Sequence, residues 1–367
     1  MVEDILKMIR IDMSRFSAYS AAKSPDVIAL KLGIPEEDII KLDANENPYG
    51  CSPRARQKMA EYPYYYIYPD SNQTEMRKAL SQYVGMDTQY LVAGNGSDEL
   101  IDLLLRILLA PGDEAIINMP TFDMYRFCTE VCRGKVVPVL RRKDFTVDVP
   151  AIKAAITDKT RIIFVTSPNN PTGTVVPEQD ILELLATGLP VVVDEAYYEF
   201  YGKTAAGLVP KYRNLIVLRT FSKWAGIAGL RVGYGIFTPE LTEVLIKVKP
   251  PYNINLAAQV AVQESIRDSE YLLATVRKMI DERRRLFAKL EKLDFLKPVP
   301  SCANFVLCEI TRGDAKKIQD DLEKRGILIR YYDTPLLRNY IRISAGKPEQ
   351  TDRIIAALQE IGGETNG

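Results

Sequence analysis

Short runs rich in Val, Ile and Leu alternate with stretches of helical periodicity between residues 75 and 250. The runs are YLVAG (90–94), EAIINM (114–119), KVVPVL (135–140), RIIFVTS (161–167), LPVVVDE (189–195), NLIVLRT (214–220) and RVGYGIF (231–237). Several are continuously apolar, which indicates strands buried on both faces, as in a parallel sheet covered by helices. This alternation constrains the fold more than any other feature, and it predicts a doubly wound α/β domain.

The pattern changes after Pro250 and Pro251, and the chain is longer than one hydrophobic core normally supports. The expected elements there are a long charged helix at about 256–293, a strand at 304–310, a helix at 314–325, the extended run GILIRYY (326–332), a strand at 340–346 and a helix at 349–361. They predict a compact α+β unit. We therefore expect an N-terminal arm at 1–50 (a short helix, then irregular chain through KLDANENPYG), a large α/β domain at 51–255 and a small domain at 256–367.

The sequence contains no histidine. This absence excludes Ser-His-Asp and Cys-His catalysis and metal sites built on imidazole, and we expect no metal site. Proton transfer near neutral pH must then come from a lysine, cysteine, tyrosine or carboxylate with a shifted pKa, or from a cofactor. Lysine is the leading candidate.

Charge and cysteine content bound the partners and the compartment. Lys and Arg number 48, as do Asp and Glu, so we expect no whole-molecule attraction to nucleic acid or to an anionic membrane. The cysteines form no CxxC pair, which favours reduced thiols in a cytoplasmic protein. The N-terminal MVEDILKMIRIDMSRF lacks the apolar stretch of a signal peptide, and no run approaches the length of a membrane span.

In open α/β sheets, ligands bind at the carboxyl ends of the strands. The segments that follow the expected strands are GNGSDE (94–99), PTFDMY (120–125), SPNNPTG (167–173), DEAYYEF (194–200) and TFSK (220–223). They place a glycine-rich turn, an aromatic ring, an amide, a carboxylate and a lysine at one edge of the sheet.

Each segment has an ordinary structural explanation when it is taken alone. The turn could begin a helix capped by Ser97, Asp194 could pair with a buried arginine, and Lys223 could lie on the surface. SPNNPTG could be a surface loop whose X-Pro bonds include a cis bond. Together, however, the segments meet the needs of pyridoxal phosphate (PLP). Its aldehyde forms a Schiff base with lysine, its ring nitrogen pairs with a carboxylate, and its phosphate binds hydroxyls, arginine and a helix N-terminus.

SPNNPTG, DEAYYEF, TFSKWAGIAGLR (220–231) and YIRISAG (340–346), in this order, resemble the motifs of fold-type I aminotransferases. The resemblance is closest to the histidinol-phosphate branch, and it extends over essentially the whole chain. It implies a mainly parallel sheet flanked by helices, a smaller α+β C-terminal domain and an N-terminal arm. It also implies a homodimer in which the partner chain completes each active site.

By this resemblance, Lys223 is the Schiff-base lysine and the catalytic base, Asp194 pairs with the pyridine nitrogen, and Tyr197 contacts the ring hydroxyl. The cofactor-binding set that it implies is Gly96, Ser97, Asp98, Phe122, Asn170, Asp194, Tyr197, Thr220, Ser222, Lys223 and Arg231, joined by Tyr68 of the neighbouring chain. Phe122 is expected to stack on the ring, at a position where the family commonly has Tyr.

The resemblance also implies how substrates bind: Arg342 takes an α-carboxylate, Arg330 takes the substrate phosphate, and Tyr19 closes over the site beside Tyr68 and Asn170. The expected reaction is ping-pong transamination of L-histidinol phosphate with 2-oxoglutarate, which gives imidazole acetol phosphate and L-glutamate in histidine biosynthesis. An aromatic amino-acid aminotransferase, a threonine-phosphate decarboxylase and a PLP-binding regulator or catalytically silent partner remain as alternatives.

Overall fold

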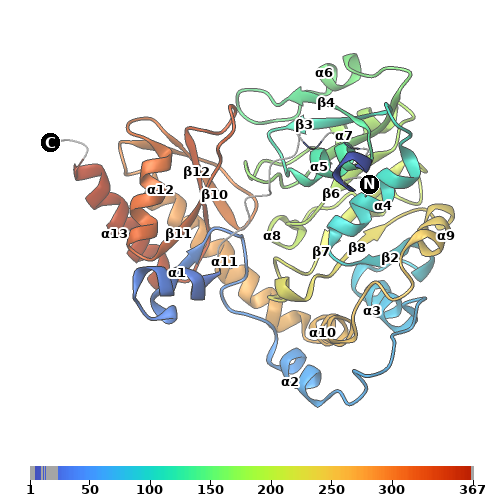
Figure 1. Cartoon of the computed structure of the whole chain (residues 1–367), viewed down its shortest axis with the longest axis horizontal. Coiled ribbons are helices and arrows are strands. Elements are labelled where there is room, and N and C mark those ends of the chain that lie inside the picture. Colours follow the sequence, from blue (N-terminus) through green and yellow to red (C-terminus); the bar gives the residue numbers. More distant parts are fainter. Residues whose placement is uncertain (1–4, 10, 12, 14–23, 365–367) are drawn as a thin grey trace.

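The computed structural model describes residues 5–9, 11, 13 and 24–364. Within this part of the chain the strands form a seven-stranded and a five-stranded sheet, which lie beside each other in Figure 1. In spatial order, the larger sheet consists of β2 (Leu91–Gly94), β8 (Gly233–Ile236), β7 (Leu215–Thr220), β6 (Val191–Asp194), β5 (Thr160–Thr166), β3 (Glu114–Met119) and β4 (Lys135–Leu140). Neighbouring strands are parallel except at β8, which is antiparallel to β2 and β7. The predicted mainly parallel sheet is confirmed.

Helices cover both faces of the larger sheet. One face carries α4 (Ser97–Leu108), α5 (Met124–Val131) and α9 (Pro239–Val248); the other carries α3 (Thr74–Val84), α6 (Val149–Ala154), α7 (Glu178–Leu185) and α10 (Leu256–Arg267). In β5, Ile162 and Phe164 join the first core, while Ile163 and Val165 join the second. Because alternate side chains point to opposite faces, a strand covered on both sides reads as one continuous apolar run.

The smaller sheet has the spatial order β1 (Ile40–Leu42), β11 (Ile327–Tyr331), β12 (Tyr340–Ser344), β10 (Phe305–Ile310) and β9 (Leu296–Val299). Its core also takes side chains from α11 (Ser269–Leu290), α12 (Ala315–Lys324) and α13 (Pro348–Glu364). The irregular chain expected around residues 40–42 is instead a strand, because its backbone pairs in parallel with β11. The segment after it is thereby fixed at the junction of the two sheets.

The single helix expected at 256–293 is wrong. The chain leaves the helical conformation at Asp268 (φ −107°, ψ 26°), so α10 and α11 are separate helices. The Asp268 carboxylate accepts a hydrogen bond from Ser52, which caps α2 (Pro53–Glu61). The break therefore involves a contact between distant segments, which local periodicity does not reveal.

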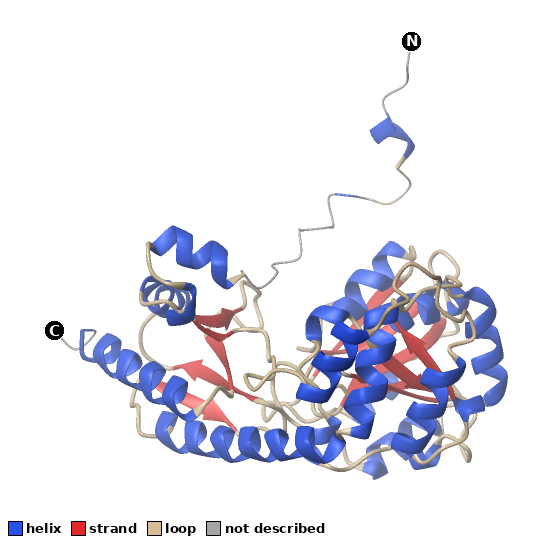
Figure 2. Ribbon diagram, turned by 90° about the horizontal axis from the view of Figure 1, so that it is seen from below, coloured by secondary structure: helices blue, strands red, loops and turns tan. Residues whose placement is uncertain are grey.

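The long helix α11 runs from the smaller sheet to the larger one (Figure 2). Val276 and Met279 pack in the core of the larger sheet, whereas Leu286 and Leu290 pack in that of the smaller sheet. The remaining helices are α1 (Pro25–Leu32), α8 (Tyr198–Tyr201) and the 3-10 helices η1 (Ile5–Met8), η3 (Glu36–Asp38), η4 (Thr88–Tyr90), η5 (Ala206–Leu208) and η6 (Ala228–Leu230). No helix in the described ranges is long and apolar enough to cross a membrane.

Candidate active site

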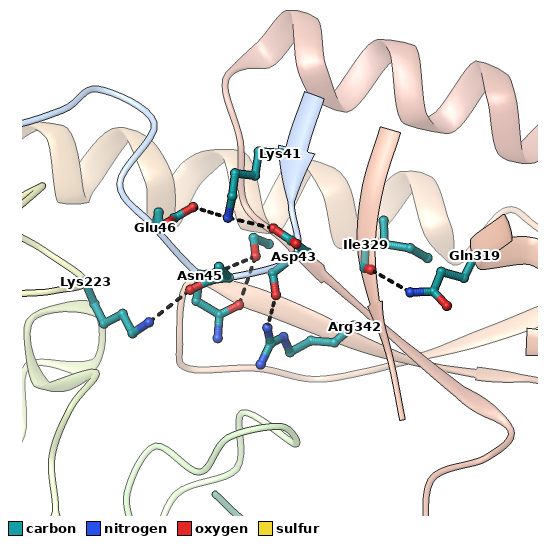
Figure 3. A network of polar contacts seen from close by, with 10 residues as sticks. Lys41, Asp43, Asn45, Glu46, Lys223, Gln319, Ile329 and Arg342 are labelled. Carbon is teal, nitrogen blue, oxygen red and sulfur yellow. Dashed lines mark hydrogen bonds and ion pairs between the residues drawn. The ribbon is translucent and has the colours of Figure 1, made fainter. Parts of the chain in front are cut away.

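Lys223 lies just after the carboxyl end of β7, and its side chain is half-buried. Its Nζ donates a 3.0 Å hydrogen bond to the carbonyl oxygen of Ala44. Figure 3 shows that the segment after β1, which contains Asp43 and Ala44, passes between Lys223 and Arg342. Arg342 donates a hydrogen bond to the carbonyl oxygen of Asp43. The pKa of Lys223 is lowered to about 8, mainly by burial and next by the charge of Arg342, while Glu46 opposes the change. The amine is therefore partly unprotonated near neutral pH.

Asp194 ends β6 and is only 2% exposed. Its Oδ1 accepts a 2.9 Å hydrogen bond from the Ala196 amide, and its Oδ2 accepts a 2.6 Å bond from the Tyr125 hydroxyl. Burial raises the pKa of Asp194 to about 6. No arginine or lysine of the described residues forms an ion pair with it; Arg219 instead pairs with Glu195. A buried carboxylate without a cation suits a ligand that brings a positive charge.

The turn before α4 meets the Lys223 segment at a group of polar atoms. Arg231 donates to Asp98 Oδ2 at 2.8 Å and to Ser222 Oγ at 3.4 Å, and the Gly96 amide donates to the Arg231 carbonyl at 3.1 Å. Thr220 lies beneath, with its hydroxyl 3.0 Å from Ser222 Oγ. The sequence motifs at 94–99 and 220–231 therefore converge on one place.

The expected capping role of Ser97 is wrong, because Gly96 is the N-cap and Ser97 begins α4. Gly96 takes a φ of 77°, which glycine adopts without strain. The turn is also closely packed: a Cβ on Gly233 would lie 2.3 Å from the Ser97 nitrogen, and one on Gly96 would lie 2.7 Å from an Arg231 nitrogen. Amides at the start of a helix, next to an arginine, are the groups that commonly bind an anion.

Tyr197 and Asn170 lie on the side of the site that faces the smaller sheet. The Tyr197 hydroxyl accepts a 2.8 Å hydrogen bond from Asn45 Nδ2, and burial raises its pKa. The Asn170 Oδ1 accepts a 2.6 Å bond from Arg342. Both prolines of SPNNPTG follow cis peptide bonds, at Ser167–Pro168 and Asn170–Pro171.

Arg330 and Arg342 are direct partners across β11 and β12. Like charges placed opposite each other in a sheet repel, so a pair of arginines at one register position favours an anionic ligand. Arg342 is 5% exposed, and its Nε has no hydrogen-bond partner among the residues that the structure describes. Its guanidinium also lies over the Phe305 ring, 5.3 Å from the ring centroid.

Three expected ring contacts with a ligand are not tested by the structure. Phe122 packs edge-on against Tyr125, with ring centroids 5.7 Å apart. Tyr68 is 78% exposed and stacks on Tyr252 at 4.6 Å. Tyr19 lies outside the described residues. The expected contacts of these three rings with a ligand stay predictions.

The sequence over residues 37–358 matches the family model for aminotransferase class I and II. The chain belongs to the class I and II aminotransferase family. It is 49% identical over 362 residues to the histidinol-phosphate aminotransferase of Dehalococcoides mccartyi, which covers 99% of this chain and 100% of the relative. It is 44% identical to histidinol-phosphate aminotransferase 1, chloroplastic, of Arabidopsis thaliana, over 96% of this chain and 85% of the relative.

A solved structure gives the same family. The histidinol-phosphate aminotransferase of Sinorhizobium meliloti, in complex with pyridoxal-5'-phosphate, superposes with a TM-score of 0.85 and 25% identity, over 96% of this chain and 100% of the other. The fold class expected from the sequence is therefore confirmed.

Two polar residues of this aminotransferase site were not assigned from the sequence. Tyr125 ends PTFDMY, three residues after Phe122, and its position at a strand end was the available signal. Asn45 lies in ANENPYG and is 1% exposed with a φ of 56°. Pairing of β1 with β11 and hydrogen bonds with Ser344 and Asn304 hold it at Tyr197. No group of three acidic or cysteine side chains in the described chain could hold a metal ion.

Proposed function

We propose that this aminotransferase uses PLP to transfer the amino group of L-histidinol phosphate to 2-oxoglutarate, in histidine biosynthesis. The observation that carries the proposal is the opposition of Arg330 and Arg342 on β11 and β12, beside the segment that also contacts Lys223. Two guanidinium groups suit 2-oxoglutarate, which has two carboxylates. One of the two guanidinium groups also suits the phosphate of histidinol phosphate. Similarity over the full length to relatives named for this substrate supports the choice.

The residues present fit PLP. Asp194 is buried without a cationic partner among the described residues, the first turn of α4 has amides with no partner inside the helix beside Arg231, and Lys223 has a lowered pKa. When bound, PLP supplies an aldehyde that bonds to amines and a ring that withdraws electrons from the substrate carbon. The turn with Arg231, Ser222 and Thr220 would hold its phosphate, and Tyr197 with Asn170 would hold its ring hydroxyl.

Lys223 and Asp194 carry the chemistry of this chain. The Lys223 amine, with a pKa of about 8, is available in part as the free base. It can remove a proton from the substrate carbon that bears the nitrogen and return it in the reverse half-reaction. Asp194, with its pKa near 6, is mostly ionised at pH 7 and holds a positive charge on the ring nitrogen.

Arg342 would bind the α-carboxylate of glutamate or 2-oxoglutarate. Its guanidinium donates hydrogen bonds to Asn170 Oδ1 and to the carbonyl oxygen of Asp43, next to the Ala44 carbonyl that Lys223 contacts. Arg330 on the neighbouring strand would take the distal group, a carboxylate in one substrate and a phosphate in the other. One site would thus accept both substrates of a ping-pong reaction.

We also propose a cytoplasmic homodimer in which Tyr68 reaches the PLP phosphate of the partner subunit. Tyr68 stands in a segment that exposes several aromatic rings, including Tyr66 at 81%. The cysteines are free thiols, as a reducing compartment allows. Analytical ultracentrifugation, together with loss of PLP affinity in Tyr68→Phe, tests the shared site.

The decisive experiment begins with PLP and the purified apoenzyme. A visible absorbance band should appear that borohydride removes, and Lys223→Ala should show none. Half-reactions with histidinol phosphate, phenylalanine and threonine phosphate then rank the substrates by the loss of that band. Faster conversion by phenylalanine than by histidinol phosphate would favour an aromatic aminotransferase, and release of carbon dioxide from threonine phosphate would favour a decarboxylase.

A further inference from the structure

A chain of buried hydroxyl groups lies behind Asp194. The Tyr125 hydroxyl donates to Asp194 Oδ2 at 2.6 Å and lies 3.0 Å from Thr166 Oγ1. Thr166 Oγ1 is 3.2 Å from Thr121 Oγ1, which donates to Asn169 Oδ1 at 2.7 Å. These side chains come from α5, from the end of β5 and from the two loops that follow β3 and β5. No step derived above uses them.

At the Asn169 end of this chain of hydroxyl groups, the direction of the hydrogen bond is fixed. Asn169 Nδ2 donates to the Pro120 carbonyl at 3.1 Å and to Thr172 Oγ1 at 2.8 Å, so Asn169 Oδ1 is the atom that faces Thr121. An amide oxygen can only accept a hydrogen bond. The single hydroxyl hydrogen of Thr121 is therefore committed to Asn169, and Thr121 cannot donate to Thr166.

At the Asp194 end, the direction of the hydrogen bond is fixed when Asp194 is ionised, because a carboxylate can only accept a hydrogen bond. The hydrogen of Tyr125 then belongs to Asp194, and the Thr166 hydrogen is the only one left for two oxygens. Its shorter contact is with Tyr125. Donation by Thr166 to the Tyr125 oxygen makes the Tyr125 hydroxyl a stronger donor towards Asp194.

The Tyr125 ring has little freedom to turn away. It is fully buried and stacks on Phe164 with ring centroids 4.7 Å apart and an angle of 16° between the planes. Phe122 packs on it edge-on. The hydroxyl is thus held at Asp194 by packing as well as by hydrogen bonds.

We propose that Tyr125 and Thr166 are positioning residues, which keep Asp194 ionised and oriented for the ring nitrogen of the cofactor. The inference rests on the proposed binding of PLP. Neither residue needs to touch the cofactor, because each acts through the carboxylate.

The charged and titratable groups around Asp194 make this donor important. Burial raises the pKa of Asp194, and Asp98 from the start of α4 and the adjacent Glu195 raise it further. The hydrogen bond from Tyr125 and the Ala196 amide lower this pKa. Tyr197 also interacts with the carboxylate, and the buried Arg141, which follows β4, interacts electrostatically with Tyr125. Without Tyr125, a single backbone amide would remain as donor.

The test measures PLP affinity of the apoenzyme against pH. In the wild type, affinity should fall as the pH drops through the pKa of Asp194, because a protonated carboxyl no longer attracts a cationic ring. Tyr125→Phe should move the acid midpoint up by about one pH unit, and so weaken binding about 2-fold at pH 7 and about 10-fold at pH 5. Thr166→Val should move the midpoint in the same direction by less.

Thr129→Val is the matched control. Thr129 is fully buried in α5, and its hydroxyl donates to the Tyr125 carbonyl at 2.7 Å, outside the chain that leads to Asp194. This variant should lose stability without moving the acid midpoint. An unchanged midpoint in Tyr125→Phe, with normal PLP binding by the wild type, overturns the inference. Failure of the wild type to bind PLP overturns the proposed function instead. If Tyr125→Phe does not fold, the midpoint of Thr166→Val decides.

Discussion

Arg219 Nε pairs with Glu195 Oε2 at 3.0 Å, and both side chains are almost fully buried. Glu195 accepts further hydrogen bonds from Thr204 and from the Ala205 amide. The arginine is therefore committed to Glu195, and the preceding residue, Asp194, receives hydrogen bonds from neutral donors. Two adjacent carboxylates lie in opposite electrostatic settings. One has its counter-charge within the fold, and the other can obtain it from a ligand.

Replacement of Arg219 by Met should destabilise the protein strongly, because it leaves Glu195 buried without a cation. We expect a loss of about 3–5 kcal/mol in the free energy of unfolding, measured by urea denaturation of the apoenzyme. The control is Arg213→Met, since Arg213 pairs with Glu240 on the surface; it should cost less than about 1 kcal/mol. Equal losses in the two variants would contradict the assignment.

Gly96→Ala should weaken PLP binding more than it weakens the fold. A Cβ at Gly96 would meet Arg231 at 2.7 Å, in a backbone conformation that disfavours alanine. The control is Gly188→Ala, where φ is +79° but no atom lies within 4 Å of the added Cβ. Both variants should lose about 1 kcal/mol of stability from the backbone. Only Gly96→Ala should also lose PLP affinity in a titration; similar affinities would contradict the phosphate site.

The rate at which the apoenzyme bonds PLP should rise with pH and level off above the pKa of Lys223, about 8. The sign follows from the need for an unprotonated amine. Burial lowers this pKa most, and the charge of Arg342 is the next cause, so Arg342→Gln should move the midpoint to higher pH. Arg312→Gln, which changes a surface residue paired with Asp294, should leave it in place. A midpoint that stays the same in Arg342→Gln would show that the two charges do not interact.

Much of the larger sheet and of the cluster around Lys223 could be predicted from the sequence. The apolar runs are continuous because the strands are covered on both faces, and parallel strands bring their carboxyl ends to one edge. Asp194 and Lys223 therefore lie at the carboxyl ends of the neighbouring strands β6 and β7, although 29 positions separate them, as counted from 194 to 223. The glycine-rich turn at 94–99 lies at the same edge of the sheet because it follows the carboxyl end of β2.

The features that could not be predicted depend on contacts between distant segments. The strand at 40–42 forms by pairing with β11, and Asn45 is held at Tyr197 by this pairing and by hydrogen bonds from distant residues such as Asn304. The break at Asp268 involves Ser52. Tyr125 stands in PTFDMY, the segment expected to follow a strand. Its hydrogen bond to Asp194, however, depends on the packing of α5 against β5. The N-cap of α4 is Gly96, one residue before the expected Ser97, because Gly96 tolerates a positive φ and Ser97 does not.

The two arginines of the smaller sheet should separate the two half-reactions. Arg342→Lys keeps the charge but loses the planar fork that grips a carboxylate. It should lower kcat/KM for glutamate about 100-fold, within the cost of truncating a buried charged pair. Histidinol phosphate has no carboxylate, so its half-reaction should lose much less. Arg330→Lys should impair both half-reactions, because glutamate and histidinol phosphate each carry a distal anion. Single-turnover absorbance changes with each substrate measure this split, and an equal loss of both half-reactions in Arg342→Lys would contradict the assigned role of Arg342.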